Sequence, residues 1–332
     1  MAIKALSWMI RIFPAPVYCY HEIVHNQVVV DRFRQHGVIF VDSIDEVPEG
    51  APVMLSAHGS APEVVRAARS NGGAVINAVC PLVTKVHHEV KTRANQGFTV
   101  IYVGHAGHDE AVGTMAVAPA AVRLVETPDD VAKLDIGQDQ PVALLAQTTL
   151  SHDEWSDVKD RANELFPNLW QPGKSDLCFA TTNRQAALKA MVDRASAIVV
   201  IGSENSSNTR ALEKVAVACG CPRVVRVNSA DELPNDLAGV VGLTAGASAP
   251  DELVEAVIDR LNPADGIEVV RVTEEDEYFP PPPELRKLVA ALEATVSLAL
   301  GVGAPRASVL ASDRTALAST VLAEFAVDTP GS

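Results

Sequence analysis

A three-fold internal repeat constrains the fold of this chain more than any other feature of its sequence. The repeated pattern is an apolar, β-rich run followed by an acidic helical turn, and it occurs at residues 38–47, 122–131 and 224–233. A second apolar run follows each copy, beginning near Pro52, Pro141 and Leu237. Self-similar segments in a fixed order indicate related supersecondary units. We therefore predict an α/β fold of three pseudo-symmetric units, each with a small parallel sheet, around a central site.

The predicted units cover residues 1–80, 81–177 and 178–265. In each unit the second apolar run ends in a small polar loop, and a helical pattern follows it. These loops are residues 56–60, 147–149 and 244–248. We expect residues 266–292 to extend the core. Residues 293–332 are rich in Ala, Val, Ser and Thr, and we expect them to form a loosely ordered tail.

Two cysteines stand at equivalent places in the repeat. Cys80 and Cys178 each precede a helical pattern, and a helix N-terminus favours the thiolate that binds metals. The first helix, predicted over residues 2–13, lacks such a cysteine. The repeat places the missing thiol just upstream of Met1, so we expect the true start of the chain to lie further upstream. The alternative, a small buried hydrophobic side chain, is our interpretation of Cys19, Cys219 and Cys221.

Charge and cysteine content narrow the classes of function. The net charge is −15 and the pI about 5.0, so nucleic acid and anionic membrane surfaces would repel the chain. Small ligands or protein partners are favoured instead. Five cysteines are an odd number, which argues against a disulfide framework and for a reducing, cytoplasmic location. No run reaches the roughly 18 apolar residues of a membrane span.

Histidines are concentrated in the first third of the chain. His25, His58 and His108 fall in loops that follow predicted strands, so they could converge on one centre. Glu110 lies two residues after His108, and a buried glutamate beside a histidine is a reasonable proton donor. A zinc site would need three or four ligands, and the sequence has no HExxH motif. We expect His87 and His105 to have structural roles.

Two loops have the composition of anion-binding sites. Residues 202–208 (GSENSSN) follow an apolar run and lead into a helix, and residues 245–248 (AGAS) have a similar arrangement. Hydroxyls, an amide and free backbone N–H groups at a helix N-terminus can bind phosphate, although plain N-capping uses the same residues. Several such loops facing one centre favour a ligand with more than one phosphate. No Walker A or GxGxxG motif is present, so a nucleotide is not indicated.

Together these motifs resemble the hydroxymethylbutenyl diphosphate reductase family over residues 1 to about 292. The matching stretches are HEIVHN (21–26), SAHG (56–59), AVCPLVTKVH (78–87), GHAGHDEAVGTM (104–115), AQTTLS (146–151), DLCFATTNRQ (176–185), GSENSSNTR (202–210) and TAGASAPD (244–251). The chain departs from the family at its start, because the family's first cluster cysteine precedes the point where this chain begins.

The resemblance implies a central [4Fe–4S] cluster that the family holds with three cysteines, of which Cys80 and Cys178 would be two. The implied contacts to the diphosphate come from His25, His58, Ser206, Ser207, Asn208 and Ser248. His108 and Thr148 would contact the substrate near its hydroxyl, and Glu110 would deliver the proton that makes this hydroxyl leave as water. The implied products are isopentenyl and dimethylallyl diphosphate, and the implied electron donor is a ferredoxin or a flavodoxin.

Two other functions remain open at this point. The first is a diphosphate-binding paralogue without a cluster or catalysis, which the absent first cysteine favours. The second is a zinc-dependent phosphohydrolase built on the histidines.

Overall fold

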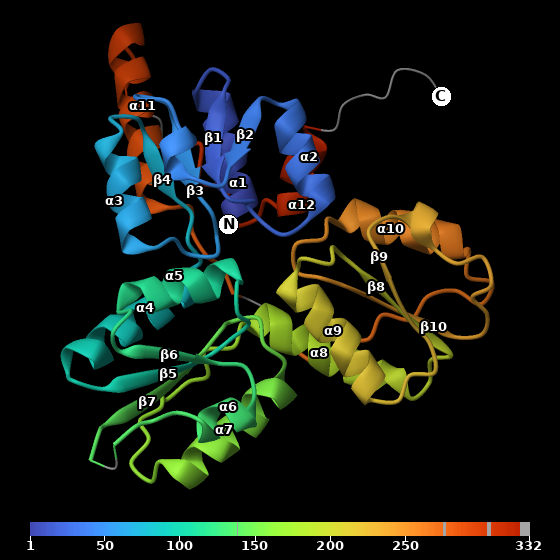
Figure 1. Ribbon diagram of the computed structural model, residues 1–332. Coiled ribbons are helices and arrows are strands. Elements are labelled where there is room, and N and C mark those ends of the chain that lie inside the picture. The colour runs from blue at the N-terminus through green and yellow to red at the C-terminus, as the bar shows by residue number, and fades with distance from the viewer. Residues whose placement is uncertain (138, 275–276, 304–306, 326–332) are drawn as a thin grey trace.

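The computed structural model describes residues 1–137, 139–274, 277–303 and 307–325. Within these residues the strands form three separate parallel sheets, each in its own lobe of the molecule (Figure 1). The prediction of three α/β units with small parallel sheets is confirmed.

The three sheets share one strand order. In the first sheet β2 (Val38–Val41), β1 (Val17–Tyr20) and β3 (Val53–Leu55) lie side by side, and β4 (Val75–Asn77) is added beyond β3. The second sheet has the order β6 (Val122–Val125), β5 (Thr99–Val103) and β7 (Val142–Ala146). The third has β9 (Val224–Val227), β8 (Ala197–Ile201) and β10 (Val241–Ala245). In each, the first strand of the unit is therefore central, the second is at the edge, and the third lies on the other side.

The repeat found in the sequence corresponds to these edge strands and the helical turns after them. β2 is followed by η1 (Ile44–Glu46), β6 by α6 (Pro128–Ala132) and β9 by η2 (Ala230–Glu232). Ser43 and Thr127 start their turns with capping boxes, in which side chain and backbone bond reciprocally. The acidic residues of the repeat thus satisfy the free N–H groups of short helices.

Helices repeat in the same order as strands. A helix precedes the central strand of each unit: α1 (Ala2–Ile12), α4 (Pro81–Asn95) and α8 (Phe179–Val192). A second helix follows that strand: α2 (Gln27–Gln35), α5 (Asp109–Val117) and α9 (Ser207–Ala218). The third strand of each unit leads into α3 (Pro62–Ser70), α7 (His152–Leu165) or α10 (Asp251–Leu261). This order repeats within 1–80, 81–177 and 178–265, and these boundaries stay our interpretation of the repeat.

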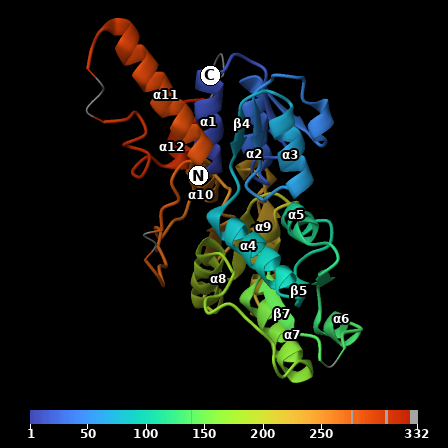
Figure 2. The same ribbon diagram turned by 90° about the vertical axis from the view of Figure 1, so that its left-hand side faces the viewer.

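The C-terminal segment differs from the loosely ordered tail expected from residue 293. α11 (Pro283–Leu300) begins in the expected core extension and continues into the expected tail, and α12 (Ala318–Ala323) packs on α1 (Figure 2). Leu285, Val289 and Leu322 belong to the same buried cluster as Leu6 and Met9 of α1. Residues 304–306 and 326–332 of the expected tail lie outside the described residues. The contacts are long-range, so local composition could not show them.

Among the described residues, no helix combines the length and the apolar character needed to cross a membrane.

Candidate functional site

The polar loops singled out in the sequence follow the first and the third strand of each unit. His25 follows β1 and His58 follows β3, while His108 follows β5 and Thr148 follows β7. In the third unit the loop carrying Ser206, Ser207 and Asn208 follows β8, and the loop carrying Ser248 follows β10. Ligands of parallel α/β sheets bind beyond the carboxyl ends of the strands. The fold therefore gathers residues from all three units at one centre.

Three histidines meet at this centre. The rings of His25 and His58 stack with centroids 4.1 Å apart and planes 14° from parallel. The ring of His108 meets both edge-on, at 5.5 Å from His25 and 5.9 Å from His58. The predicted convergence of these histidines is thus present. Burial, together with the charges of His25 and His108, holds the pKa of His58 well below its usual range.

Asp109 joins this histidine cluster. Its Oδ1 lies 2.9 Å from Nδ1 of His21, and its Oδ2 lies 3.6 Å from Nδ1 of His58 and 3.9 Å from Nε2 of His25. Ligand atoms of His25, His58 and Asp109 all lie within 4.8 Å of one another, so this triad could also hold a divalent cation. Neither Asp109 nor His21 was predicted from the sequence as a site residue.

His108 has a defined tautomer because it caps α5. Its Nδ1 accepts a hydrogen bond from the backbone N–H of Glu110 at 3.2 Å. The proton of the neutral ring therefore sits on Nε2. Burial and the charge of His25 lower the pKa of His108 to about 4. At neutral pH it is an uncharged donor at the edge of the histidine cluster.

Glu110 is buried, with 2% of its surface exposed. Its Oε1 accepts the backbone N–H of Thr148 at 2.8 Å, and its Oε2 accepts the Thr148 hydroxyl at 2.9 Å. Burial raises the pKa of Glu110 to about 7, against the lowering effect of the two Thr148 hydrogen bonds. The carboxyl group is therefore partly protonated and partly ionised near neutral pH. A group of this kind can give up a proton at working pH.

The serine-rich loop of the third unit contacts the second unit through side chains. Ser207 Oγ accepts from Gln147 Nε2 at 3.2 Å and lies 2.9 Å from the Thr149 hydroxyl. Ser206 Oγ accepts the N–H of Thr209 at 3.3 Å and so serves as the cap of α9. Gln147 is fully buried and was not predicted as a site residue, although it opens the polar loop 147–149.

Asn208 is the residue of this loop that most clearly lacks a partner. It is 5% exposed, and within the described residues neither its Nδ2 nor its Oδ1 has a hydrogen-bond partner. An unpaired buried amide costs free energy, so the site fits a ligand that bonds it. Ser248 lies on the facing loop, where its hydroxyl donates to the His25 carbonyl at 3.3 Å.

Cys80 and Cys178 occupy the N-cap positions of α4 and α8. Both are partly exposed free thiols. Burial raises the pKa of each thiol, while backbone N–H groups of the following helix lower it. The charges of Cys80 and Glu110 both raise the pKa of Cys178, so the two thiols and Glu110 lie close together. Met1 occupies the same N-cap position on α1, and the charge of Cys80 acts to raise the pKa of its amino group.

Cys19 and Cys221 lie apart from this arrangement, whereas His105 contacts it through its Nδ1, which is 3.4 Å from Ser207 Oγ. Cys19 is buried in β1, and Cys221 Sγ donates to the Arg223 carbonyl at 3.2 Å. His105 lies at the rim, with its Nε2 3.7 Å from Glu154 Oε1. Burial lowers the pKa of His87 to about 4. The structural roles predicted for these residues stay interpretations.

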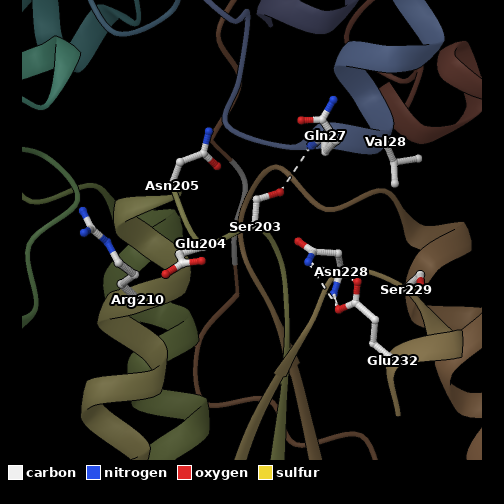
Figure 3. A pocket seen from close by; sticks show the side chains of 9 residues that line it. All are labelled: Gln27, Val28, Ser203, Glu204, Asn205, Arg210, Asn228, Ser229 and Glu232. Carbon is white, nitrogen blue, oxygen red and sulfur yellow. Dashed lines mark hydrogen bonds between the residues drawn. The ribbon is translucent and has the colours of Figure 1, made fainter.

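A cavity of about 710 Å³ lies beside the site, where the start of α2 meets the third unit (Figure 3). The Ser203 hydroxyl accepts the backbone N–H of Gln27 across its wall at 3.2 Å. The residues lining it are Gln27, Val28, Ser203, Glu204, Asn205, Arg210, Asn228, Ser229 and Glu232. Ser203, Glu204 and Asn205 belong to the predicted anion-binding loop 202–208. Asn205 Nδ2 donates to Glu22 Oε2 at 3.0 Å, and that carboxylate lies 3.4 Å from His25 Nδ1, so the cavity adjoins the histidine centre.

The fold and this centre define a class: a protein of three α/β units whose polar loops meet at one centre, beside a pair of thiols at helix N-termini. Comparison with known families narrows this class to one family. The family model described as LytB protein matches residues 1–262. The chain belongs to the LytB family.

Relatives and solved structures agree with this assignment. A protein of Rhodopirellula baltica named 4-hydroxy-3-methylbut-2-enyl diphosphate reductase is 46% identical over 295 residues, which is 87% of this chain and 92% of that protein. A protein of the same name from Cutibacterium acnes is 45% identical over 294 residues, covering 86% and 90%.

Two solved structures are similar in fold. The reductase of Plasmodium falciparum superposes with a TM-score of 0.85 at 28% identity, covering 88% of this chain and 94% of that one. A second reductase, described as the terminal enzyme of the non-mevalonate pathway, has a TM-score of 0.58 at 30% identity, covering 79% and 93%.

Proposed function

We propose that this chain reduces 4-hydroxy-3-methylbut-2-enyl diphosphate to isopentenyl and dimethylallyl diphosphate, the last step of the methylerythritol phosphate route to isoprenoid precursors. Membership of the LytB family and the names of relatives at 45–46% identity support this activity. In the reaction the allylic C–O bond breaks, the oxygen leaves as water, and the carbon skeleton gains a pair of electrons and a proton.

The observation that carries the proposal is the environment of Glu110. A hydroxyl leaves far more easily as water than as hydroxide, so the reaction needs a proton donor beside the oxygen. Glu110 is buried, its pKa is raised to about 7, and Thr148 fixes both carboxyl oxygens. We assign it as the general acid. His108 and Thr148 would orient the substrate's hydroxyl next to it, with His108 donating from Nε2.

The substrate's diphosphate fits the polar loops around the histidines. We propose that it is held by His25, His58, Ser206, Ser207, Asn208 and Ser248. The unpaired amide of Asn208 supplies a donor, and the ring of His58 would supply another. Backbone N–H groups at the start of α9 add favourable charge for an anion. A diphosphate bound there would place the short allylic chain toward Glu110 and the cysteine-capped helices.

Family membership points to an iron–sulfur cofactor, and we propose that it is a [4Fe–4S] cluster. Cys80 and Cys178 fit two of its ligands, because both thiols cap helices, are partly exposed and sense each other's charge. When bound, such a cluster supplies a Lewis-acidic iron for the substrate's oxygen and a path for electrons. We further propose that a ferredoxin or a flavodoxin delivers these electrons, since the reaction consumes an electron pair in every turnover.

Anaerobic purification tests this proposal against its two alternatives. We expect brown protein containing iron and sulfide, and conversion of the allylic diphosphate when a reduced ferredoxin or flavodoxin is present. Cys178→Ser should lose most of the iron and the activity, whereas Cys219→Ser should lose neither. Colourless protein that binds the diphosphate without turnover would instead support a binding paralogue. Zinc without iron, together with phosphate release, would support a phosphohydrolase.

A further inference from the structure

Asp176 is a buried carboxylate two residues before Cys178, and only 2% of its surface is exposed. Its two oxygens serve two different donors: Oδ1 accepts from Lys85 Nζ at 3.0 Å, and Oδ2 accepts the backbone N–H of Ala146 at 3.2 Å. We propose that Asp176 is a positioning residue, which ties the Cys178 segment to α4 and to β7 and so fixes the two thiols relative to each other and to Thr148. This inference rests on the proposed role of these thiols as cluster ligands.

Lys85 connects Asp176 to the other thiol. It lies in the second turn of α4, the helix whose N-cap is Cys80. The same ammonium donates to the Lys174 carbonyl at 3.2 Å, so it holds the loop before Cys178 at two points. At a rise of about 1.5 Å per residue, Lys85 stands only roughly 7 Å along the helix from Cys80. A shift of this loop relative to α4 would therefore change the separation of the thiols and break both hydrogen bonds.

Ala146 connects Asp176 to the proposed proton donor. It is the last residue of β7, which lies at the edge of the second sheet (Figure 1). Farther along the same two segments, the Cys178 N–H donates to the Thr148 carbonyl at 2.8 Å. Thr148 in turn holds Glu110 through its own N–H and hydroxyl. By aligning its segment with β7, Asp176 therefore keeps the thiol in register with the general acid.

The first unit holds its cysteine in another way. There β4 pairs with β3, and the Cys80 N–H continues the pairing by donating to the Ala57 carbonyl at 3.0 Å. In the second unit, no strand lies between α7 and α8 in the part of the chain that the structure describes. The Asp176 side chain takes the place of that strand beside β7. Cys178 therefore depends on one side chain where Cys80 is supported by a strand.

A carboxylate suits this position because each of its oxygens accepts a different hydrogen bond. An amide has the same shape but only one accepting oxygen, and its NH2 group would face one of the two donors. A buried donor that is left without an acceptor costs free energy. Asp176→Asn therefore removes one tie while it keeps the volume of the side chain. Lys85→Met removes the tie to α4 from the more exposed end, since the Lys85 side chain is 37% exposed.

Iron retention by the full chain tests this role. After anaerobic reconstitution, we expect Asp176→Asn and Lys85→Met to lose iron to a chelator roughly 10- to 100-fold faster than the unaltered chain. This is the factor by which metal affinity typically falls when a residue that orients a metal ligand is removed. Lys85→Arg keeps the charge and should recover most of the retention. The matched controls are Asp153→Asn and Lys189→Met, because this pair has the same 3.0 Å separation and a lysine of similar exposure, 40%, but joins α7 to α8.

Hydrogen exchange in the chain without its cluster separates positioning from a general loss of stability. In Asp176→Asn we expect faster amide exchange in peptides that cover residues 144–148 and 174–180, while the rest of the second unit exchanges as in the unaltered chain. Exchange reports local opening of the backbone. Because it needs no metal, it measures how firmly the Cys178 segment is held even where no cluster forms.

The outcomes separate the inference from the proposed function. Iron loss from Asp176→Asn at the rate of Asp153→Asn would overturn the inference, and so would faster exchange spread evenly over the second unit. If Asp176→Asn does not fold, as judged by circular dichroism, fast iron loss from Lys85→Met with recovery in Lys85→Arg still supports it, and equal loss from both contradicts it. An unaltered chain that takes up no iron would contradict the proposed function, whereas the exchange of Asp176→Asn would still show whether Asp176 holds the Cys178 segment.

Discussion

At the scale of single residues, the site depends on a few side chains whose ionisation is set by burial. Glu110 and Asp109 are adjacent in the chain, yet the pKa of the first is raised to about 7 and that of the second is lowered to about 2. The difference arises because burial outweighs the two Thr148 hydrogen bonds at Glu110, whereas the hydrogen bond from His21 and the nearby imidazoles outweigh burial at Asp109. One carboxyl can therefore carry a proton at neutral pH while the other remains a fixed negative charge.

The raised pKa of Glu110 predicts the pH dependence of turnover. Glu110 is protonated below its pKa and ionised above it, so the fraction able to give a proton falls as pH rises through about 7. We expect kcat, measured with excess donor, to fall over that range. Glu110→Gln cannot give a proton, and we expect a loss of roughly 10²–10⁴-fold with little change in pyrophosphate affinity. A Glu110→Gln variant with near-normal kcat would rule out the general-acid role.

The sequence predicted which histidines meet, but not how they are held. His25, His58 and His108 could be placed together because all three fall in loops that follow strands. The contacts of Asp109 with His21 and His58 depend on how the first two units pack. That packing has no local signature, since an aspartate in a helix first turn is common for reasons of capping alone.

At the scale of elements, α5 brings the two carboxylates to the histidines by close approach to another loop. A Cβ on Gly113 of α5 would lie 2.3 Å from the Gly59 carbonyl oxygen, next to His58 in sequence. The helix therefore packs backbone to backbone against the loop of the first unit. Glycine is required here for contact, despite its cost of roughly 0.5–1 kcal/mol in a helix.

Gly113→Ala should separate α5 from the loop that carries His58. The helical preference of alanine offers up to about 1 kcal/mol, while forcing extra volume against packed backbone costs about 1–3 kcal/mol. We expect the packing cost to exceed the gain in helical preference, so that Gly113→Ala has a lower melting temperature and weaker pyrophosphate binding. Gly97→Ala at the end of α4 is less suitable as a control because its φ is +84°. Gly137→Ala, with open space around it, serves better, and an unchanged Gly113→Ala would contradict the packing argument.

At the scale of the whole molecule, the site is assembled from pairs of units. His21 and Asp109 join the first and second units, Gln147 and Ser207 join the second and third, and Gln27 and Ser203 join the first and third. The repeat allowed this convergence to be predicted, because equivalent strand ends of a pseudo-symmetric fold face a common axis.

The C-terminal segment could not be predicted in the same way. It lies outside the repeat, its composition is uniform, and its contacts reach more than 300 positions back along the chain. Lys4 of α1 donates to the Asp313 carbonyl at 2.6 Å and to its carboxylate at 3.0 Å, and the Tyr278 hydroxyl donates to that carboxylate at 2.9 Å. Farther along, Ser319 donates to Asp251 of α10 at 2.6 Å. The segment thus connects the first unit to the third.

Lys4→Met should release this segment. The side chains of Lys4 and Asp313 are only 11% and 4% exposed, and removing one partner of a buried pair costs about 3–5 kcal/mol because the other charge stays uncompensated. We expect limited proteolysis, followed by mass spectrometry, to cut within residues 307–325 much faster than in the unaltered chain. Lys287→Met on the exposed face of α11 is the control. Adding Asp313→Leu to Lys4→Met should restore resistance, since no buried charge then lacks a partner. Equal cleavage of Lys4→Met and Lys287→Met would show that the pair does not hold the segment.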